Sequence, residues 1–146
     1  PLIINDRLDI ALACNADGVH LGQKDIPLPA ARKVLGPEKI IGITAANKAQ
    51  AEKAQSQGAD YLGVGPVFHT DSKDKPSPEL GIQNLFLIRK QIKIPILAIG
   101  GINSQNAAAV MSTGVHGIAV ISAVLNSSDP KESTQKLIRE IGKTKS

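Results

Sequence analysis

Short runs of apolar, mostly β-branched residues alternate along the chain with longer segments whose apolar residues recur at helical spacing. The strand-like runs occupy residues 2–5, 18–21, 39–43, 61–64, 96–99 and 118–121. Helix-like segments follow them at residues 8–14, 29–35, 47–57, 82–92, 104–112 and 132–141. Leu85, Ile88 and Ile92 illustrate the helical spacing. Six such units in succession predict an α/β fold with six parallel strands and right-handed crossovers.

The last two strand-like runs end abruptly in small residues. Gly100-Gly101 closes one of them, and Ser122 closes the other after Ile121. In a TIM barrel, the loops after the last two strands and the N-terminus of a short helix bind phosphate through backbone N–H groups. A strand-to-helix turn with positive φ also explains the glycine pair. The second element favours a phosphate site.

Two architectures fit six consecutive β/α units. A doubly wound open sheet uses the six strands as they stand, whereas a closed (β/α)8 TIM barrel needs two more. The Gly-x-Gly-x-x-Gly pattern of dinucleotide-binding folds does not follow the first strand-like run. We therefore expect the last three-quarters of a TIM barrel, lacking its first two β/α units.

Composition narrows the class of protein. The chain has 146 residues, 42% of them hydrophobic, and we expect one soluble domain over residues 1–146. Aromatic residues make up only 2%, so the core must be built from Ile, Leu, Val and Ala, as in parallel strands buried on both faces. The net charge of +4 suits small anionic ligands, whereas the scarcity of aromatic side chains disfavours nucleic acid.

The cysteine and histidine residues add little chemistry. The single cysteine, Cys14, permits no internal disulfide and is compatible with a reducing compartment, so we expect a cytoplasmic location. Its apolar surroundings, residues 10–14, predict a core position. His20, His69 and His116 are not at zinc-ligand spacing; we expect His20 in the core or projecting into the barrel, and His116 at the surface. No apolar stretch reaches the ~18 residues of a membrane span.

Polar residues close the predicted strands, at the barrel edge where catalytic side chains gather. Each also has an ordinary structural explanation. Asp6 and Thr44 can cap helices, Asp25 can stabilise a turn, and Lys73 can be a solvated loop charge. Together, however, Asp6 and Asp25 form a candidate Mg²⁺ site, because this ion takes one or two carboxylates plus phosphate oxygens. Lys73 lies in an unpatterned stretch, residues 68–80, that is long enough to close over a substrate and reach its phosphates.

Several longer strings carry a family resemblance. Residues 18–25 are Gly-Val-His-Leu-Gly-Gln-Lys-Asp, and residues 63–73 are Gly-Val-Gly-Pro-Val-Phe-His-Thr-Asp-Ser-Lys. Together with Ile4-Asn5-Asp6, Ile99-Gly100-Gly101-Ile102 and Val120-Ile121-Ser122-Ala123, they make the chain resemble the thiamine phosphate synthase family over essentially all 146 residues. That family joins a hydroxymethylpyrimidine pyrophosphate to a thiazole phosphate and releases pyrophosphate with help from Mg²⁺.

The resemblance implies a role for each matching residue. Asp6 and Asp25 would ligate Mg²⁺, and Thr44 and Lys73 would be the catalytic groups. Asn5, Thr44 and Lys73 would contact the pyrimidine pyrophosphate. The thiazole phosphate would be bound by Thr70, Asp71, Ser72, Gly101, Ile121 and Ser122. Ionisation of the C–O bond leaves charge on pyrophosphate that Mg²⁺ and Lys73 would stabilise, whereas the thiazole nitrogen needs positioning rather than a base.

Three departures from the family pattern are visible. Thr44-Ala45-Ala46 stands where the family has Ser, a small residue and His, so the hydroxyl is kept and the His is lost. Ser72 stands where Thr is usual. The two opening β/α units of the family, with a Gln-x-Arg-x-Lys strand that grips the pyrophosphate, have no counterpart here.

Two rival functions follow from these departures. A thiazole tautomerase, a paralogue of the synthase, uses the His that Ala46 replaces, and the two candidate metal carboxylates also favour the synthase. A non-catalytic barrel fragment would at most bind a phosphate-bearing ligand, and the absent basic strand is the feature that favours it.

Six strands leave two open sheet edges. We therefore expect residues 2–5 and 118–121 to flank a gap two strands wide rather than to pair with each other. The simplest expectation is that the native protein has residues upstream of Pro1. An isolated chain should otherwise aggregate or pair its edges with another copy as a homo-oligomer.

Overall fold

The computed structural model describes residues 1–70 and 78–142 and contains one sheet of six parallel strands in the order β1-β2-β3-β4-β5-β6. The α/β class and the six parallel strands are therefore confirmed. The strand bounds are β1 (Ile3–Asn5), β2 (Gly18–Leu21), β3 (Ile40–Ala45), β4 (Tyr61–Val64), β5 (Ile96–Ile99) and β6 (Gly117–Ala119).

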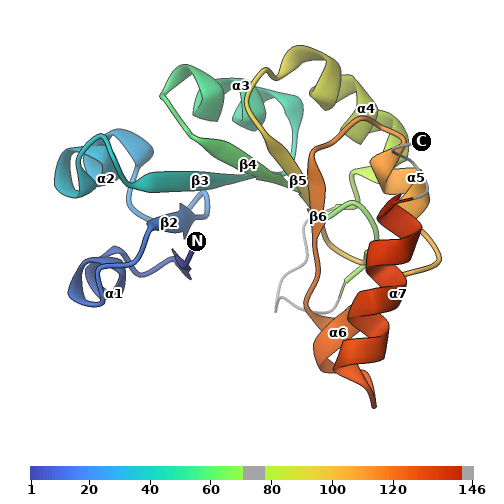
Figure 1. Ribbon diagram of the computed structural model, residues 1–146. Helices are drawn as coiled ribbons and strands as arrows, with labels where there is room; N and C mark the ends of the chain where they lie inside the picture. Colours follow the sequence, from blue (N-terminus) through green and yellow to red (C-terminus); the bar gives the residue numbers. More distant parts are fainter. Residues whose placement is uncertain (71–77, 143–146) are drawn as a thin grey trace.

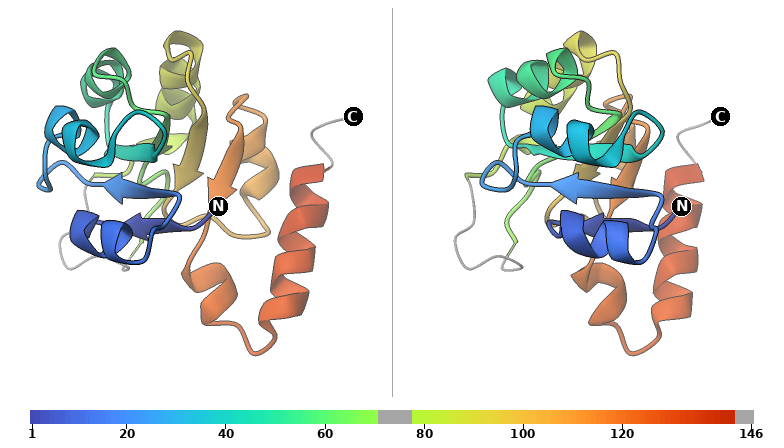
Figure 2. Two further views of the ribbon diagram at one scale, coloured as in Figure 1. Left: turned by 60° about the vertical axis from the view of Figure 1, so that its left-hand side comes forward. Right: turned by 90° about the vertical axis from the view of Figure 1, so that its left-hand side faces the viewer.

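The sheet curls into a half-barrel with the helices on its convex side (Figure 1; Figure 2 gives two further views). Consecutive parallel neighbours joined by right-handed crossovers place every connecting helix on the same face, whereas a doubly wound sheet carries helices on both faces. The fold is therefore a partial TIM-like barrel. The helices are α1 (Leu8–Ala13), α2 (Leu28–Leu35), α3 (Lys48–Ser56), α4 (Gly81–Gln91), α5 (Ala107–Met111), α6 (Ser122–Leu125) and α7 (Pro130–Gly142).

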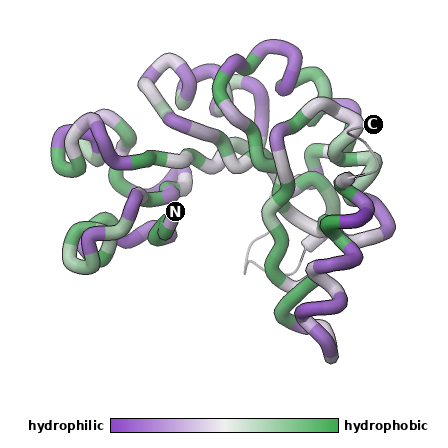
Figure 3. Tube along the Cα trace, in the orientation of Figure 1, coloured by the Kyte–Doolittle hydropathy of each residue, from purple (hydrophilic) through white to green (hydrophobic). Residues whose placement is uncertain are grey.

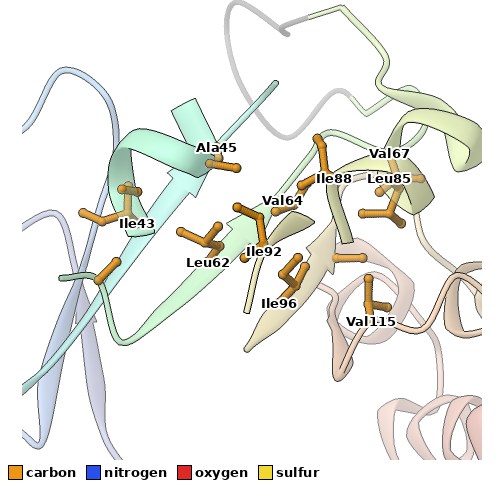
Figure 4. Close-up of a cluster of buried hydrophobic side chains, with 14 of the residues drawn as sticks. Ile43, Ala45, Leu62, Val64, Val67, Leu85, Ile88, Ile92, Ile96 and Val115 are labelled. Carbon is orange, nitrogen blue, oxygen red and sulfur yellow. The ribbon is translucent and has the colours of Figure 1, made fainter. Parts of the chain in front are cut away.

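The core lies between the convex face of the sheet and the helices. Leu62, Val64 and Ile96 from the strands meet Leu85 and Ile88 from α4, and all five are at most 2% exposed (Figure 4). Burying a side chain of this size stabilises the fold by about 1.5–3 kcal/mol. The predicted aliphatic core is confirmed.

Strand register decides which residues share the concave face. Asn5, His20, Gly42 and Tyr61 lie side by side across β1 to β4. The neighbouring row is formed by Thr44, Gly63 and Leu97. His20, Thr44, Tyr61 and Leu97 are only half-buried. The concave face therefore holds the polar side chains of His20, Thr44 and Tyr61 together with the apolar Leu97.

The strands β1 and β6 form the two edges of the sheet, and no pairing between them occurs in the described part of the chain. The expectation that they do not pair is confirmed, while the width of the gap stays a prediction. The segment of β6 and α6 is largely hydrophobic, whereas α7 is largely hydrophilic (Figure 3). Near this edge, Ile121 is 55% exposed and Leu125 is 72% exposed.

Some element bounds differ from the prediction because side chains redirect the backbone. The predicted helix 104–112 begins only at Ala107, since Asn106 Oδ1 accepts the Asn103 N–H (2.9 Å) and Asn106 Nδ2 donates to the Gly101 carbonyl (3.0 Å). The last helix, expected over residues 132–141, begins two residues earlier as α7 at Pro130, where Asp129 Oδ1 accepts the Glu132 N–H (2.9 Å).

The predicted core position of Cys14 is wrong. Cys14 follows the last residue of α1 and is exposed, because the single buried residue of this short helix is Ala11. In the two described ranges, no helix combines the length and the apolar composition that crossing a bilayer requires.

Candidate functional site

The carboxyl end of β1 has a strained backbone. Asp6 has φ 63°, and its N–H donates to the His20 carbonyl (2.8 Å), which ties it to the end of β2. A non-glycine residue in this region costs of order 1–3 kcal/mol and often marks a functional position. The cap of α1 is Arg7, so the helix-cap explanation of Asp6 is wrong. Asn5, beside it, is exposed at the end of β1.

The loop after β2 is held by the carboxylate of Asp25. Its Oδ2 atom accepts the Gly22 N–H (2.6 Å), so Asp25 closes the turn of residues 22–25. Gln23 Nε2 donates to the Thr44 carbonyl (2.6 Å) and joins this loop to β3. A cavity of about 150 Å³ lies behind the loop, lined by Gly22, Gln23, Asp25, Ile26, Pro27, Leu28, Ile43, Gln50, Lys53, Ala54 and Gln57.

Three polar side chains on the concave face form one hydrogen-bonded group. His20 Nδ1 lies 2.9 Å from Tyr61 Oη, and His20 Nε2 lies 2.9 Å from Thr44 Oγ1. The predicted capping role of Thr44 is wrong, because Asn47 caps α3 by accepting the Gln50 N–H (3.0 Å). Burial raises the pKa of the Tyr61 phenol above its ordinary value.

This group was missed by sequence reasoning, which treated His20 only as a core residue or a residue projecting into the barrel. His20 and Tyr61 lie in the strand-like runs 18–21 and 61–64, and Thr44 directly follows the run 39–43, so no single run contains two members of the group. Only the register between the runs brings His20 to Thr44 and Tyr61.

The loops after β4 and β5 are bonded to each other. Val67 N donates to the Ile99 carbonyl (2.9 Å), and Phe68 N donates to the Gly100 carbonyl (3.1 Å). Gly100 and Gly101 have φ 97° and 64°, as the turn explanation required. A Cβ on Gly101 would also overlap the His69 carbonyl oxygen. Thr70, the next residue along the chain, is thus brought close to Gly101.

The carboxyl end of β6 lies beside that of β5. Ile121 and Ser122 are both exposed there, and Ser122 begins the short helix α6. The structure therefore gathers Thr70, Gly101 and Ser122 at one end of the sheet. Three further predicted site residues, Asp71, Ser72 and Lys73, lie outside the described residues.

Within residues 1–70 and 78–142, no three side chains among His, Cys, Asp and Glu gather closely enough to hold a metal ion by themselves. The donors at the ends of β1 and β2 are the carboxylates of Asp6 and Asp25. Such hard oxygen donors, one or two in number, fit Mg²⁺ completed by phosphate oxygens and water.

Comparison with known proteins gives one consistent result. A family model described as thiamine monophosphate synthase matches residues 1–124. Thiamine-phosphate synthase of Moorella thermoacetica is 52% identical over 139 residues, which is 95% of this chain and 66% of the relative. The same enzyme of Syntrophomonas wolfei is 53% identical over 137 residues, 94% of this chain and 66% of the relative. The chain thus spans about two thirds of the length of these relatives.

Solved structures agree with this result. Thiamine phosphate pyrophosphorylase from Pyrococcus furiosus superposes with a TM-score of 0.89 at 43% identity, covering 97% of this chain and 67% of that one. A 3-hexulose-6-phosphate synthase superposes with a TM-score of 0.68 at 19% identity, covering 92% of this chain and 66% of that one, and this shows the fold alone.

Proposed function

Because the chain belongs to the thiamine monophosphate synthase family, we propose that it forms part of a (β/α)8 barrel that couples hydroxymethylpyrimidine pyrophosphate to thiazole phosphate. The products would be thiamine phosphate and pyrophosphate. The family membership and the identity of about 50% to named synthases support this activity. The two small-molecule substrates are the expected partners, and the cytoplasm is the expected location.

One structural observation supports the proposal best: two sets of candidate residues lie on different strands but at the same end of the sheet. Asn5, Asp6, Asp25 and Thr44 belong to the ends of β1, β2 and β3. Thr70, Gly101 and Ser122 belong to the ends of β4, β5 and β6. This arrangement suits two ligands bound next to each other at one end of the sheet, one at the ends of β1 to β3 and the other at the ends of β4 to β6. The reacting atoms would then lie between them.

The carboxylates of Asp6 and Asp25 would hold Mg²⁺, which would neutralise charge on the departing pyrophosphate. Asp25 is oriented for this role because the Gly22 N–H donates a hydrogen bond to its Oδ2 atom. The Thr44 hydroxyl and the Lys73 ammonium would donate hydrogen bonds to pyrophosphate oxygens.

The thiazole phosphate would lie against the loops of Gly101 and Ser122. There the positive φ of Gly101 (64°) shapes the turn whose backbone N–H groups would face the phosphate. The exposed N-terminal turn of α6 would add backbone N–H groups.

The tautomerase alternative is disfavoured by position 46. Ala46 has no side chain that can transfer a proton. Its backbone N–H donates a hydrogen bond to Gln50 Oε1 (2.7 Å). A proton-transfer enzyme needs a titratable group at that place.

The decisive experiment supplies the native protein with both substrates and Mg²⁺ and follows thiamine phosphate by chromatography. Formation of thiamine phosphate together with equimolar pyrophosphate supports the proposal. Binding of either phosphate ester with no product would instead support a non-catalytic phosphate-binding barrel.

A further inference from the structure

We propose that His20 and Tyr61 are positioning residues that orient the Thr44 hydroxyl so that it donates its hydrogen to an anionic phosphate oxygen. The identity of that anion, a pyrophosphate group, rests on the proposed function. The orientation itself rests on the side chains of β2, β3 and β4.

The imidazole of His20 is held between two hydroxyl groups. Its Nδ1 lies 2.9 Å from Tyr61 Oη and its Nε2 lies 2.9 Å from Thr44 Oγ1. The two rings are tilted by 36°, with their centroids 5.4 Å apart. The three residues come from three adjacent strands, so the position of each ring is fixed by the sheet.

Two glycines keep the space that these rings occupy. Gly42 lies next to His20 in the register, and a Cβ there would overlap the Tyr61 ring. Gly63 lies next to Thr44, and a Cβ there would approach His20 Cε1 to 2.9 Å. The arrangement of the three side chains therefore depends on these glycines of β3 and β4 as well as on the hydrogen bonds.

The direction of the hydrogen bonds decides what Thr44 offers to a ligand. If Tyr61 donates to Nδ1, the imidazole proton is on Nε2 and is donated to Thr44 Oγ1. The Thr44 hydroxyl then keeps its own hydrogen for a ligand. In the opposite direction, Thr44 would donate to Nε2 and present only a lone pair, which repels an anion.

The chemistry of the two hydroxyl groups favours the first direction. Among the described residues, the hydrogen bond found for Tyr61 Oη is the one to His20. A phenol is a stronger hydrogen-bond donor and a weaker acceptor than an aliphatic hydroxyl, so Tyr61 donates to Nδ1 and Thr44 Oγ1 accepts from Nε2. Burial also raises the phenol pKa, so the group keeps its proton at neutral pH.

The first test determines which nitrogen of His20 bears the proton. The native protein is labelled with ¹⁵N-histidine, and long-range proton–nitrogen correlations are recorded in mildly alkaline buffer. His116 is an internal standard, because its Nδ1 accepts the Ile96 N–H (3.0 Å) and its proton must be on Nε2. We expect His20 to match His116, and Tyr61→Phe to shift His20 toward the other tautomer. A proton on Nδ1 of His20 in the wild type would overturn the inference.

The second test measures binding of inorganic pyrophosphate with Mg²⁺ by calorimetry. Thr44→Val, which keeps the shape but removes the hydroxyl, should weaken binding about 10-fold or more, and Thr44→Ser should largely restore it. Tyr61→Phe should weaken binding about 3-fold in the wild type but have no further effect in the Thr44→Val background. Equal effects of Tyr61→Phe in both backgrounds would overturn the inference and leave Tyr61 a merely structural role.

Unchanged pyrophosphate binding in Thr44→Val, or no binding by the wild type, would also overturn the inference. Failure of the proposed function is observed separately, as the absence of thiamine phosphate when both substrates are supplied. The tautomer of His20 does not depend on that reaction.

Discussion

The carbonyl oxygen of His69 occupies the space in which a side chain on Gly101 would begin. This close approach joins the loop after β4 to the loop after β5, beside the hydrogen bond from Val67 N to the Ile99 carbonyl (2.9 Å). Glycine at position 101 is therefore required by packing and by its φ of 64°, whether or not a ligand is bound. The same contact sets the place of Thr70 relative to Gly101.

The first prediction compares Gly101→Ala with Gly114→Ala. Both glycines have positive φ, 64° and 84°, but the nearest atom to a Cβ on Gly114 is Arg89 Cγ at 3.8 Å. Gly114→Ala should cost about 1–2 kcal/mol of unfolding free energy, from backbone strain alone. Gly101→Ala should cost clearly more in urea unfolding, because the loops must also separate. Equal losses in the two variants would show that the His69 contact has no energetic importance.

The same pair tests the phosphate site by calorimetry. Gly101→Ala should weaken binding of thiazole phosphate while leaving binding of pyrimidine pyrophosphate largely intact. Gly114→Ala, which lies outside the candidate site, should change neither affinity. Equal weakening of both ligands by Gly101→Ala would argue against separate sites.

The second prediction concerns Asp25→Asn. The amide oxygen of Asn can still accept the Gly22 N–H, so the loop and the unfolding free energy should change by less than about 1 kcal/mol. The charge that would attract Mg²⁺ is lost, and turnover should fall at least about 100-fold. Glu38→Gln removes the same charge ahead of β3, at the opposite end of the sheet, and should leave turnover unchanged. Full Mg²⁺-dependent activity in Asp25→Asn would remove Asp25 from the metal site.

The third prediction uses Tyr61, the single tyrosine of the chain. Burial raises the pKa of its phenol above the ordinary value of 10.0. In the folded protein the ultraviolet absorbance of tyrosinate should therefore develop only above that pH, and in urea it should develop at the ordinary value. Because the folded state holds this proton more tightly, its contribution to stability is present below pH 10 and is lost as the pH rises through the folded pKa. Coincident titration curves for the folded and unfolded chains would contradict the burial argument.

The fourth prediction concerns Asp9 on α1. A hydrogen bond from the Arg7 guanidinium lowers the pKa of Asp9 to about 2, from its usual 3.8. A carboxylate of lowered pKa stabilises the fold above its unfolded pKa, and that contribution is lost as the pH falls from about 4 to about 2. Carbonyl NMR should show Asp9 titrating near pH 2, and Arg7→Gln should return it to its usual range. Lys33→Gln, which removes a cation from α2 instead, should leave the Asp9 titration where it is.

Because Arg7 and Asp9 are both largely exposed, with side chains 62% and 66% accessible, we expect little change in unfolding temperature. A large loss of stability in Arg7→Gln at neutral pH would indicate that the Arg7–Asp9 ion pair contributes to folding as well as lowering the pKa of Asp9. The same experiment thus separates a local pKa effect from a structural one.

The alternation of apolar runs along the chain was sufficient to predict the six β/α units. Short apolar runs and apolar residues at helical spacing are patterns of residues close together in the chain, so they are visible without knowledge of the tertiary contacts. The start of α7 at Asp129-Pro130 was equally local, because the Asp129 carboxylate accepts a hydrogen bond from a residue three positions later. Cys14 shows the limit of such reasoning: its neighbours are apolar, but the helix turns it to solvent.

The sequence by itself therefore determined the class, the order of the elements and the candidate residues at the strand ends. Only the tertiary structure decided which of these residues meet. His20 reaches Thr44 across 24 positions and Tyr61 across 41 positions of the chain, and Gly101 is pressed against the loop that precedes α4. Such contacts depend on the register between strands and on the curvature of the sheet. Both arise from the packing of all six units together, and no local pattern of residues encodes them.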